Sequence, residues 1–245
     1  MTRNSDSPEN AGSAGTVAPP TPYLGALLAT EKYGRTAQLV LKERVFRTFD
    51  RLLVSCNSSG MTPGKRLLDL GSAGGALVDV ATANGLEAVG LDVTDGLDFE
   101  SDDLPLPDAH FDVVTLVAVI EHLREPAKLL RETLRVLKPG GAFIIVTPNW
   151  RYSYRNFFDD PTHLRPYTEK SLGYLLTSFG FDGVDVVPWL VCKPAWMWRA
   201  PYAFQLARLI PFRGQASRLI PRFLKGQSKS LLGIGFRKPA PAVNQ

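Results

Sequence analysis

The sequence predicts an α/β fold in which a mostly parallel, doubly wound sheet carries helices on both faces. From residue 65 onward, short apolar or β-branched runs alternate with amphipathic segments, an order typical of strands joined by crossover helices. Two of these runs, HFDVVTLVAVI (110–120) and AFIIVTPN (142–149), are apolar at nearly every position, as strands buried on both faces are. A chain of 245 residues is long enough to bury one core of this kind.

The expected elements follow one another in a regular order. Residues 23–55 place apolar groups at helical spacing, with a break near Gly34. After a turn at NSSGMTPG (57–64), strands are predicted at 66–70, 87–92, 110–120, 142–149, 182–189 and 228–239. Helices are predicted at 76–84 with Gly85 at its end, at 124–141 with a Pro-Gly-Gly stop, and at 168–181 with Thr168 as the N-cap.

The N-terminal segment differs from the rest of the chain in composition. Residues 1–22 are rich in Ser, Gly, Pro and Ala and lack the apolar core of a signal peptide. We therefore expect a disordered tail at 1–22, followed by one domain at 23–240. Cys56 and Cys192 lie far apart and match no metal-ligand spacing, so they are interpreted as reduced thiols of a cytoplasmic protein.

The turn after the first predicted strand is rich in small residues and follows a carboxylate. It runs Gly71-Ser72-Ala73-Gly74-Gly75 and allows a backbone to approach a ligand beside a helix N-terminus. The dinucleotide fingerprint G-x-G-x-x-G does not fit, because its later glycines would fall on Ala73 and Ala76. Asp69 suits a cationic ligand better than a pyrophosphate, and Asp92, after the next strand, suits ribose hydroxyls. Together these features favour a cofactor site over an ordinary turn.

Six segments carry a resemblance to a known family. They are DLGSAGG (69–75), VGLD (89–92), DDLPLPDAHFDVV (102–114), VIEHL (119–123), LLRETLRVLKPGG (129–141) and FIIVTPN (143–149). In this order and spacing, over about residues 65–181, the chain resembles the class I methyltransferases that use S-adenosyl-L-methionine. The resemblance implies a Rossmann-like, mostly parallel seven-stranded sheet with an antiparallel last strand, N-terminal helices and an insert before the last strand.

The resemblance also implies roles in binding S-adenosyl-L-methionine. Asp69 would lie near the amino acid end of the cofactor, and Asp92 would hold its ribose hydroxyls. The small residues of the turn that would line the methionine and ribose portion are Gly71, Ala73 and Gly75.

Further candidates follow along the chain. Glu100 occupies the position of the acid usually placed near the adenine amino group, and Asp102 is its nearby competitor. Val119, Glu121 and His122 would flank the cofactor pocket. For Glu121 and His122, a hydrogen-bonding or helix-start role is at least as well supported as a chemical one.

Two departures from the family pattern have structural consequences. Ala73 stands where the family has its central glycine, which adds a methyl group where the cofactor passes. The span from Asp92 to Phe111 is too short for the helix and strand that the family usually has there. We expect that helix to be lost or reduced to a turn, with room for a short strand.

The loop after the fifth family strand, NWRYSYRNFFDDPTHLRPYT (149–168), contains the candidate catalytic residues. Methyl transfer to a hydroxyl requires alignment and removal of a proton. His163 is the predicted base, Asp160 would orient it, and Arg165 would bind an anionic group. The alternative is that His163 and Arg165 only hold the loop against the next helix. Asp159 and His163 alone are too few ligands to predict a metal, so none is predicted.

The chain is polarised in charge. Its net charge is +4, yet ten Lys and Arg and no Asp or Glu follow Asp185, which leaves −6 on the first 185 residues. Residues 188–228 form a basic insert with three tryptophans, Trp189, Trp196 and Trp198. This insert suits a lid on the core, a docking surface for an anionic membrane, or a nucleic-acid surface. Nucleic acid is the least favoured, because no Asn/Asp-Pro-Pro-aromatic motif follows the fourth strand.

These observations lead to one principal hypothesis and two alternatives. The principal hypothesis is an S-adenosyl-L-methionine-dependent methyltransferase acting on an oxygen of a sugar, a lipid-linked glycan or a related small molecule. It would be cytoplasmic, with peripheral contact to the membrane. The first alternative is methylation of a quinone-like isoprenoid ring. The second is a non-catalytic module that keeps the fold and binds a membrane or a partner, which Ala73 and the short span after Asp92 leave open.

Overall fold

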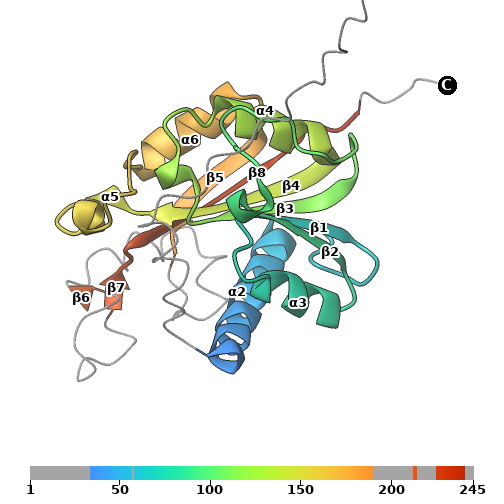
Figure 1. Cartoon of the computed structure of the whole chain (residues 1–245), viewed down its shortest axis with the longest axis horizontal. Helices are drawn as coiled ribbons and strands as arrows, with labels where there is room; N and C mark the ends of the chain where they lie inside the picture. Colours follow the sequence, from blue (N-terminus) through green and yellow to red (C-terminus); the bar gives the residue numbers. More distant parts are fainter. Residues whose placement is uncertain (1–33, 57, 190–211, 214–224, 241–245) are drawn as a thin grey trace, which may run out of the picture.

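The computed structural model describes residues 34–56, 58–189, 212–213 and 225–240. The predicted tail at 1–22, the first part of the predicted helix at 23–55, Cys192 and most of the basic insert lie outside these residues. Six strands form the main sheet in the order β2-β1-β3-β4-β8-β5 (Figure 1). Their bounds are β1 Arg66–Leu70, β2 Glu87–Leu91, β3 Phe111–Val117, β4 Leu137–Pro148, β5 Asp182–Pro188 and β8 Ser230–Phe236.

Strand directions agree with the predicted mixed sheet. β1 pairs in parallel with β2 and with β3, and β3 pairs in parallel with β4. β8, the last strand, is antiparallel to both β4 and β5. The antiparallel last strand is therefore confirmed. A separate short pair, β6 Phe212–Arg213 and β7 Lys225–Gln227, is parallel.

Two helical layers cover the sheet, as the alternation of elements predicted. Helices α2 (Arg35–Ser55) and α3 (Ala76–Ala83) lie on one face, and α4 (Ala127–Val136) and α6 (Glu169–Ser178) lie on the other (Figure 1). The period-2 alternation of β4 supplies both cores: Phe143 and Ile145 pack in the α4 and α6 core, and Ile144 packs in the α2 and α3 core. A fifth, short helix, α5 (Trp150–Ser153), follows β4 directly.

The prediction of seven strands is wrong for the described residues, which form a six-stranded main sheet. Between β2 and β3 the chain makes a 3₁₀ turn at Val93–Asp95 and then loops, so the short strand expected there does not form. Asp92 begins this turn with a capping box that it shares with Asp95. The loss of the family's full helix in this span is confirmed, and β2 becomes an edge of the sheet.

Other element boundaries differ from the sequence predictions in instructive ways. Helix α4 ends at Val136, and the Pro-Gly-Gly segment lies within β4 rather than ending the helix. There the pairing of β3 with β4 shifts register, and Gly140 has a φ of +77°. Gly34 is the N-cap of α2, at the predicted break, and Thr168 is the N-cap of α6, as predicted. No helix among the described residues is long and apolar enough to cross a membrane.

Candidate functional site

The glycine turn lies at the carboxyl end of β1, where the chain enters α3. Its backbone is left-handed at three positions, with φ of +75° at Gly71, +46° at Ala73 and +71° at Gly75. A Cβ at Gly71 would stand 2.2 Å from Cγ2 of Val119, so only glycine fits there. A Cβ at Gly75 would meet no described atom within 4 Å. The turn is therefore an open cradle whose backbone a ligand can approach closely.

Asp92 ties this turn to the loop after β2. One oxygen of its carboxylate accepts a hydrogen bond from the backbone N–H of Ala73 at 3.0 Å. The other accepts from the backbone N–H and the hydroxyl of Thr94, both at 3.1 Å. A carboxylate offers about four acceptor sites, so capacity remains for a further donor. The predicted contact with ribose hydroxyls is compatible with this geometry and stays a prediction.

Asp69 lies inside the sheet, one residue before β1 ends. It is 2% exposed and accepts a hydrogen bond from the Thr115 hydroxyl of β3 at 2.7 Å. Burial raises the pKa of Asp69 to about 6, while the bond from Thr115 and the charge of Lys42 oppose that rise. A nearby cation would stabilise the ionised form of such a buried carboxylate. The predicted contact of Asp69 with a cationic group of a ligand is compatible with this geometry and stays a prediction.

These residues fit the cofactor that the family resemblance implies. The left-handed turn leaves the backbone open, and Asp69 and Asp92 place two carboxylates beside it. Ala73 does not close the cradle, because this residue is exposed. S-adenosylmethionine, which carries an ammonium group, a sulfonium and a ribose, matches this set of groups.

The two acids expected near the adenine are held by backbone amides. Glu100 accepts hydrogen bonds from the N–H groups of Arg124 and Glu125, each at 3.0 Å. Asp102 accepts from the backbone N–H of Asp98 at 2.8 Å. Glu100 thus anchors the chain just before α4, a structural role that its sequence position did not indicate. Adenine contacts by Glu100 or Asp102 remain predictions.

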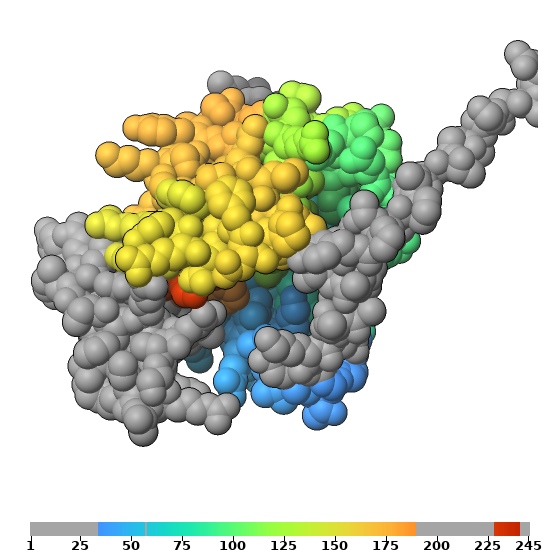
Figure 2. All heavy atoms as spheres, turned by 60° about the vertical axis from the view of Figure 1, so that its left-hand side comes forward, coloured from blue at the N-terminus to red at the C-terminus, as the bar shows by residue number. Residues whose placement is uncertain are grey.

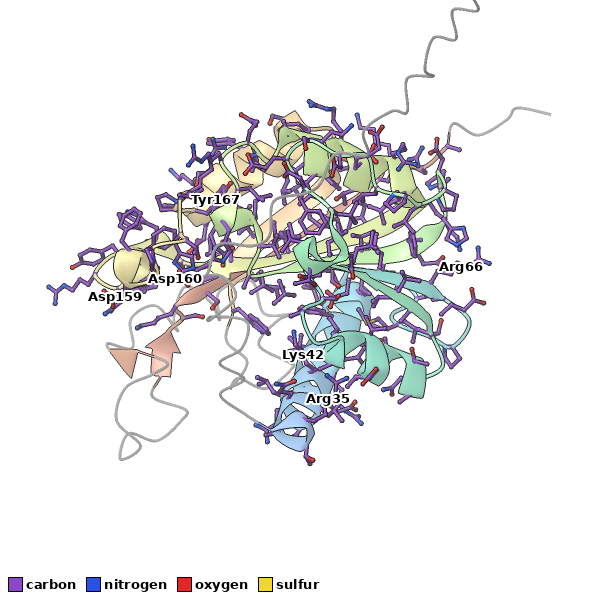
Figure 3. The ribbon with its side chains drawn as sticks, viewed as in Figure 1. Arg35, Lys42, Arg66, Asp159, Asp160 and Tyr167 are labelled. Atoms are coloured by element: carbon purple, nitrogen blue, oxygen red, sulfur yellow. The ribbon has the colours of Figure 1, made fainter. Side chains whose placement is uncertain are left out.

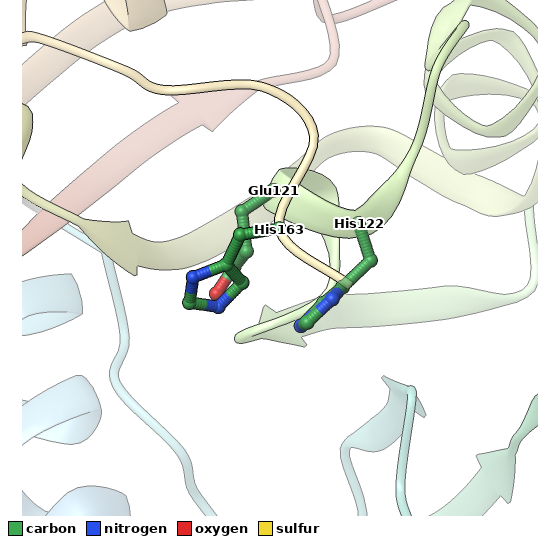
Figure 4. Close-up of side chains that lie close together, drawn as sticks. All are labelled: Glu121, His122 and His163. Carbon is green, nitrogen blue, oxygen red and sulfur yellow. The ribbon is translucent and has the colours of Figure 1, made fainter. Parts of the chain in front are cut away.

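A second group of polar side chains meets beyond the carboxyl ends of β3 and β4. Glu121, His122 and His163 each direct a ligand-type atom to within 4.8 Å of the others (Figure 4). Glu121 and His122 belong to a 3₁₀ turn, Ile120–His122, that follows β3, and His163 belongs to the loop after β4. We call these three residues the Glu-His-His cluster.

Backbone hydrogen bonds bring the two loops together. The N–H groups of Leu164 and Arg165 both donate to the carbonyl oxygen of Glu121, at 2.8 and 3.0 Å. The loop is also closed at its base, because Trp150 N–H donates to the carbonyl of Tyr167 at 2.9 Å. These contacts fix His163 beside the turn after β3.

Both histidines are held through Nδ1. His163 Nδ1 lies 2.6 Å from the carbonyl oxygen of Phe157, and His122 Nδ1 lies 3.2 Å from the carbonyl oxygen of Thr162. A carbonyl only accepts, so Nδ1 of His163 carries the proton. Nδ1 of His122 also lies 2.9 Å from the Thr162 hydroxyl, which gives its own proton to Asp160, so Nδ1 of His122 carries the proton as well. In both rings Nε2 then presents its lone pair. The rings lie with their centroids 4.8 Å apart.

The other predicted catalytic residues lie around this cluster. Asp160 Oδ2 is 3.9 Å from His163 Nε2, longer than a hydrogen bond, and Asp160 Oδ1 accepts from the Thr162 hydroxyl at 2.6 Å. The bond that orients His163 is thus made by Phe157 and not by Asp160. Arg165 is half-buried in the same loop. Its predicted contact with an anion remains a prediction.

The predicted site residues gather at one end of the sheet. Figure 3 shows Asp159 and Asp160 at the end opposite Arg66, the first residue of β1. Segment 150–180 is drawn in yellow to orange in Figure 2 and forms much of the surface facing the viewer. Hollows of about 350 Å³ beside α6 and β5 and about 550 Å³ between α2 and α3 lie elsewhere in the described structure.

Sequence reasoning did not bring Glu121 and His122 together with His163. The signal was present in the predicted topology. Neighbouring parallel strands end at the same edge, so the residues after β3 and those after β4 must meet there. Thr147, which donates to Glu121 at 3.0 Å from the end of β4, was also missed, since a lone threonine in an apolar strand carries little sequence signal.

Comparison with known proteins gives a clear family match. A family model described as a methyltransferase domain matches residues 37–186, more than half of the chain. A protein of Mycolicibacterium smegmatis, named a probable S-adenosylmethionine-dependent methyltransferase, is 42% identical over 88 residues, covering 35% of this chain and 34% of that protein. A demethylmenaquinone methyltransferase of Renibacterium salmoninarum is 34% identical over 113 residues, covering 40% of this chain and 47% of that protein.

The fold is shared with solved structures. A crystal structure of a SAM-dependent methyltransferase from Archaeoglobus fulgidus matches with a TM-score of 0.55 and 19% identity, covering 87% of this chain and 99% of that chain. At this identity the likeness concerns the fold alone. The matched regions span about a third to a half of the length of the two curated relatives.

Proposed function

The chain belongs to the methyltransferase-domain family, and we propose that it transfers a methyl group from S-adenosylmethionine to an oxygen atom of its acceptor. The acceptor we propose is a sugar, a lipid-linked glycan or a related small molecule. One observation carries the proposal: the open cradle of the glycine turn and the Glu-His-His cluster are joined by Val119. This residue packs on Gly71 and stands two positions before Glu121.

The residues of the cradle are proposed to hold and orient the cofactor. When bound, S-adenosylmethionine supplies an electrophilic methyl group on a sulfonium. The backbone of Gly71 and Gly75 lets it approach closely, and Asp69 contributes negative charge near its ammonium group. Asp92 accepts from ribose while it keeps the turn in place through Ala73. This arrangement aligns the reacting atoms, which is the main requirement of in-line transfer.

The cluster is proposed to act on the acceptor hydroxyl. A bond forms between the hydroxyl oxygen and the methyl carbon, and the carbon–sulfur bond breaks with its electron pair staying on sulfur. The hydroxyl proton would pass to Nε2 of His163 and from there to solvent, and S-adenosylhomocysteine would be the second product. Glu121, His122 and His163 are the groups beside the cradle that can promote loss of this proton. Arg165, in the same loop, is proposed to contact an anionic group of the acceptor.

A quinone-like isoprenoid ring is the second candidate acceptor. The observation that favours it is the similarity to the demethylmenaquinone methyltransferase. An apolar ring substrate would also suit the aromatic insert at 188–228.

The deciding experiment incubates the purified protein with methyl-labelled S-adenosylmethionine and an extract of native cells. The products are separated into lipid, glycan, nucleic-acid, protein and small-molecule fractions. Label in an alkali-stable ether of a glycan or small molecule supports the proposal, and label on a quinone ring carbon supports the second candidate. No label in any fraction, together with no measurable binding of S-adenosylmethionine, contradicts both and favours a non-catalytic module.

His163 provides the test at the level of one residue. His163→Ala is expected to lower the rate of methyl transfer at least a hundredfold, while the dissociation constant for S-adenosylmethionine changes less than threefold. Equilibrium dialysis with labelled cofactor gives the second quantity. His110→Ala is the matched control, because His110 lies at the opposite end of β3. Full turnover of His163→Ala would remove this residue from the reaction.

A further inference from the structure

We propose that the Glu-His-His cluster binds a divalent transition-metal ion, with Zn²⁺ as the representative ligand. Two imidazoles and one carboxylate are a donor set that zinc and its neighbours prefer. The three residues come from two loops that follow adjacent strands, β3 and β4. The fold itself, and not one short motif, therefore brings the donors together.

The histidine rings are arranged as metal ligands usually are. A metal-binding histidine commonly donates its second ring N–H to a backbone carbonyl or a carboxylate, which fixes the ring and its tautomer. His163 does so to Phe157 at 2.6 Å, and His122 does so to Thr162 at 3.2 Å. Both Nε2 atoms are left as the nitrogens that can coordinate. Each histidine thus has its own hydrogen bond at Nδ1 that fixes the ring, and this supports a preorganised metal site.

Glu121 supplies the carboxylate of the site. It is 1% exposed, and its carboxylate accepts one hydrogen bond from the Thr147 hydroxyl at 3.0 Å. Within the described residues, no Lys or Arg forms a salt bridge with it. Asp160 lies nearby, 3.9 Å from His163 Nε2, and adds a second negative charge. A buried carboxylate with a second acid beside it favours a bound cation.

The separation of the donor atoms is compatible with one ion. All three lie within 4.8 Å of one another. Tetrahedral zinc with bonds of about 2.1 Å places its ligand atoms about 3.4 Å apart. Side-chain movements of about 1 Å would therefore bring the three donor atoms to the spacing that zinc requires. Three protein ligands leave one position open for an exogenous oxygen, as catalytic zinc sites do. Figure 4 shows the three side chains directed toward the same space.

The role of this ion rests on the proposed methyl transfer to oxygen. A hydroxyl of the acceptor that occupies the open position would lose its proton to solvent more readily, since a bound cation lowers the pKa of a coordinated oxygen. The same contact would orient that oxygen toward the cradle. His163 then acts as a ligand, which replaces the free base that the sequence suggested.

The test measures metal binding directly. Metal-free protein is titrated with Zn²⁺ by calorimetry and with Co²⁺ by visible absorption, where intense d–d bands report a four-coordinate site. We expect one equivalent to bind, and His122→Ala and His163→Ala each to weaken Zn²⁺ binding more than tenfold. His110→Ala and the double variant Cys56→Ser/Cys192→Ser are the controls, and both should bind as the parent protein does. Circular dichroism confirms that each variant is folded.

The outcomes separate this inference from the proposed function. Weakened metal binding in both cluster variants, with the controls unchanged, supports the site. Absence of a one-equivalent transition, or binding that survives both histidine substitutions, overturns it. Methyl transfer that continues at full rate after chelation, in protein shown to be metal-free, overturns the catalytic role of the ion while the proposed function stands.

Discussion

At the scale of single residues, the cradle combines tight steric limits with an unusual charge. Gly71 is fixed by its contact with Val119, because any side chain would overlap Cγ2 of that valine. Asp69 is fixed by the hydrogen bond that it accepts from Thr115 in the neighbouring strand β3. The first residue sets where the backbone runs, and the second places a carboxylate where little water can reach it. A cationic ligand bound beside Asp69 would offset the cost of burying this carboxylate.

Asp69 should therefore make folding sensitive to pH in the cofactor-free protein. Its pKa is about 6 in the folded state against 3.8 ordinarily, so the folded state favours the protonated form. The associated stability is present below pH 3.8 and is lost as pH rises through about 6. The shift corresponds to about 3 kcal/mol. We expect Asp69→Asn, which keeps an acceptor for Thr115, to become more stable than the parent protein as pH rises from 4 to 7.

Urea unfolding of the two proteins at several pH values measures this difference. The comparison cancels the titration of groups that both proteins share. A difference in unfolding free energy that stays constant between pH 4 and pH 7 would mean that the carboxylate of Asp69 is not destabilised by burial.

Candidate site residues could be identified from the sequence where they belong to a local pattern. Asp69, Gly71, Gly75 and Asp92 stand at strand ends in a recognisable order, and the structure places all of them around one turn. The Phe157 carbonyl that holds His163 could not be foreseen, since every residue carries a carbonyl and only the loop conformation selects this one.

At the scale of elements, the start of α6 is set by a side-chain cap. Thr168 begins α6 with a reciprocal pair of bonds: its hydroxyl accepts from Ser171 N–H at 3.2 Å, and Ser171 Oγ accepts from Thr168 N–H at 2.9 Å. Such a cap was visible in the sequence. The end of α4 was not, because Pro-Gly-Gly usually stops a helix, whereas here it forms an irregular part of β4.

Removal of the Thr168 cap gives a prediction at this scale. Thr168→Ala should lower the free energy of unfolding by about 1 kcal/mol, because the backbone N–H of Ser171 at the start of α6 loses its acceptor, the Thr168 hydroxyl. Thr168→Ser should restore most of it. Thr177→Ala, an exposed position within the same helix, is the control and should change stability by less than about 0.5 kcal/mol. Equal effects at both threonines, measured by urea unfolding, would contradict the capping role.

At the scale of the whole molecule, the order of strands explains how distant segments form one site. Because β1, β3 and β4 are neighbours and parallel, the loops that follow them all emerge at one edge. This much follows from the sequence pattern. That the described residues form six strands and not seven in the main sheet could be predicted only in part, because the short span after Asp92 rules out a full helix but leaves room for a strand.

Charge is the second property of the whole chain. The first 185 residues carry the acidic groups of the candidate site, and the ten cations after Asp185 have no acidic neighbour in sequence. We propose that the insert at 188–228 docks on an anionic membrane surface, with Trp196 and Trp198 in the interface and arginines toward the headgroups, whereas Trp189 packs against Phe49 of α2. Such docking would bring the site close to a lipid-linked acceptor.

This proposal predicts binding that depends on charge. The protein should bind vesicles of phosphatidylcholine with 30% phosphatidylglycerol at about 0.05 M salt, and release them at about 0.5 M, where the Debye length is short. Replacing Arg208, Arg213, Arg218 and Arg222 with Gln should weaken binding about a thousandfold, at about 1 kcal/mol per charge. Co-sedimentation gives the bound fraction. Arg47→Gln/Arg51→Gln on α2 is the control, and pure phosphatidylcholine is the lipid control. Equal binding to both lipids, or equal binding by the parent protein and the insert variant, would contradict charge-dependent docking of the insert.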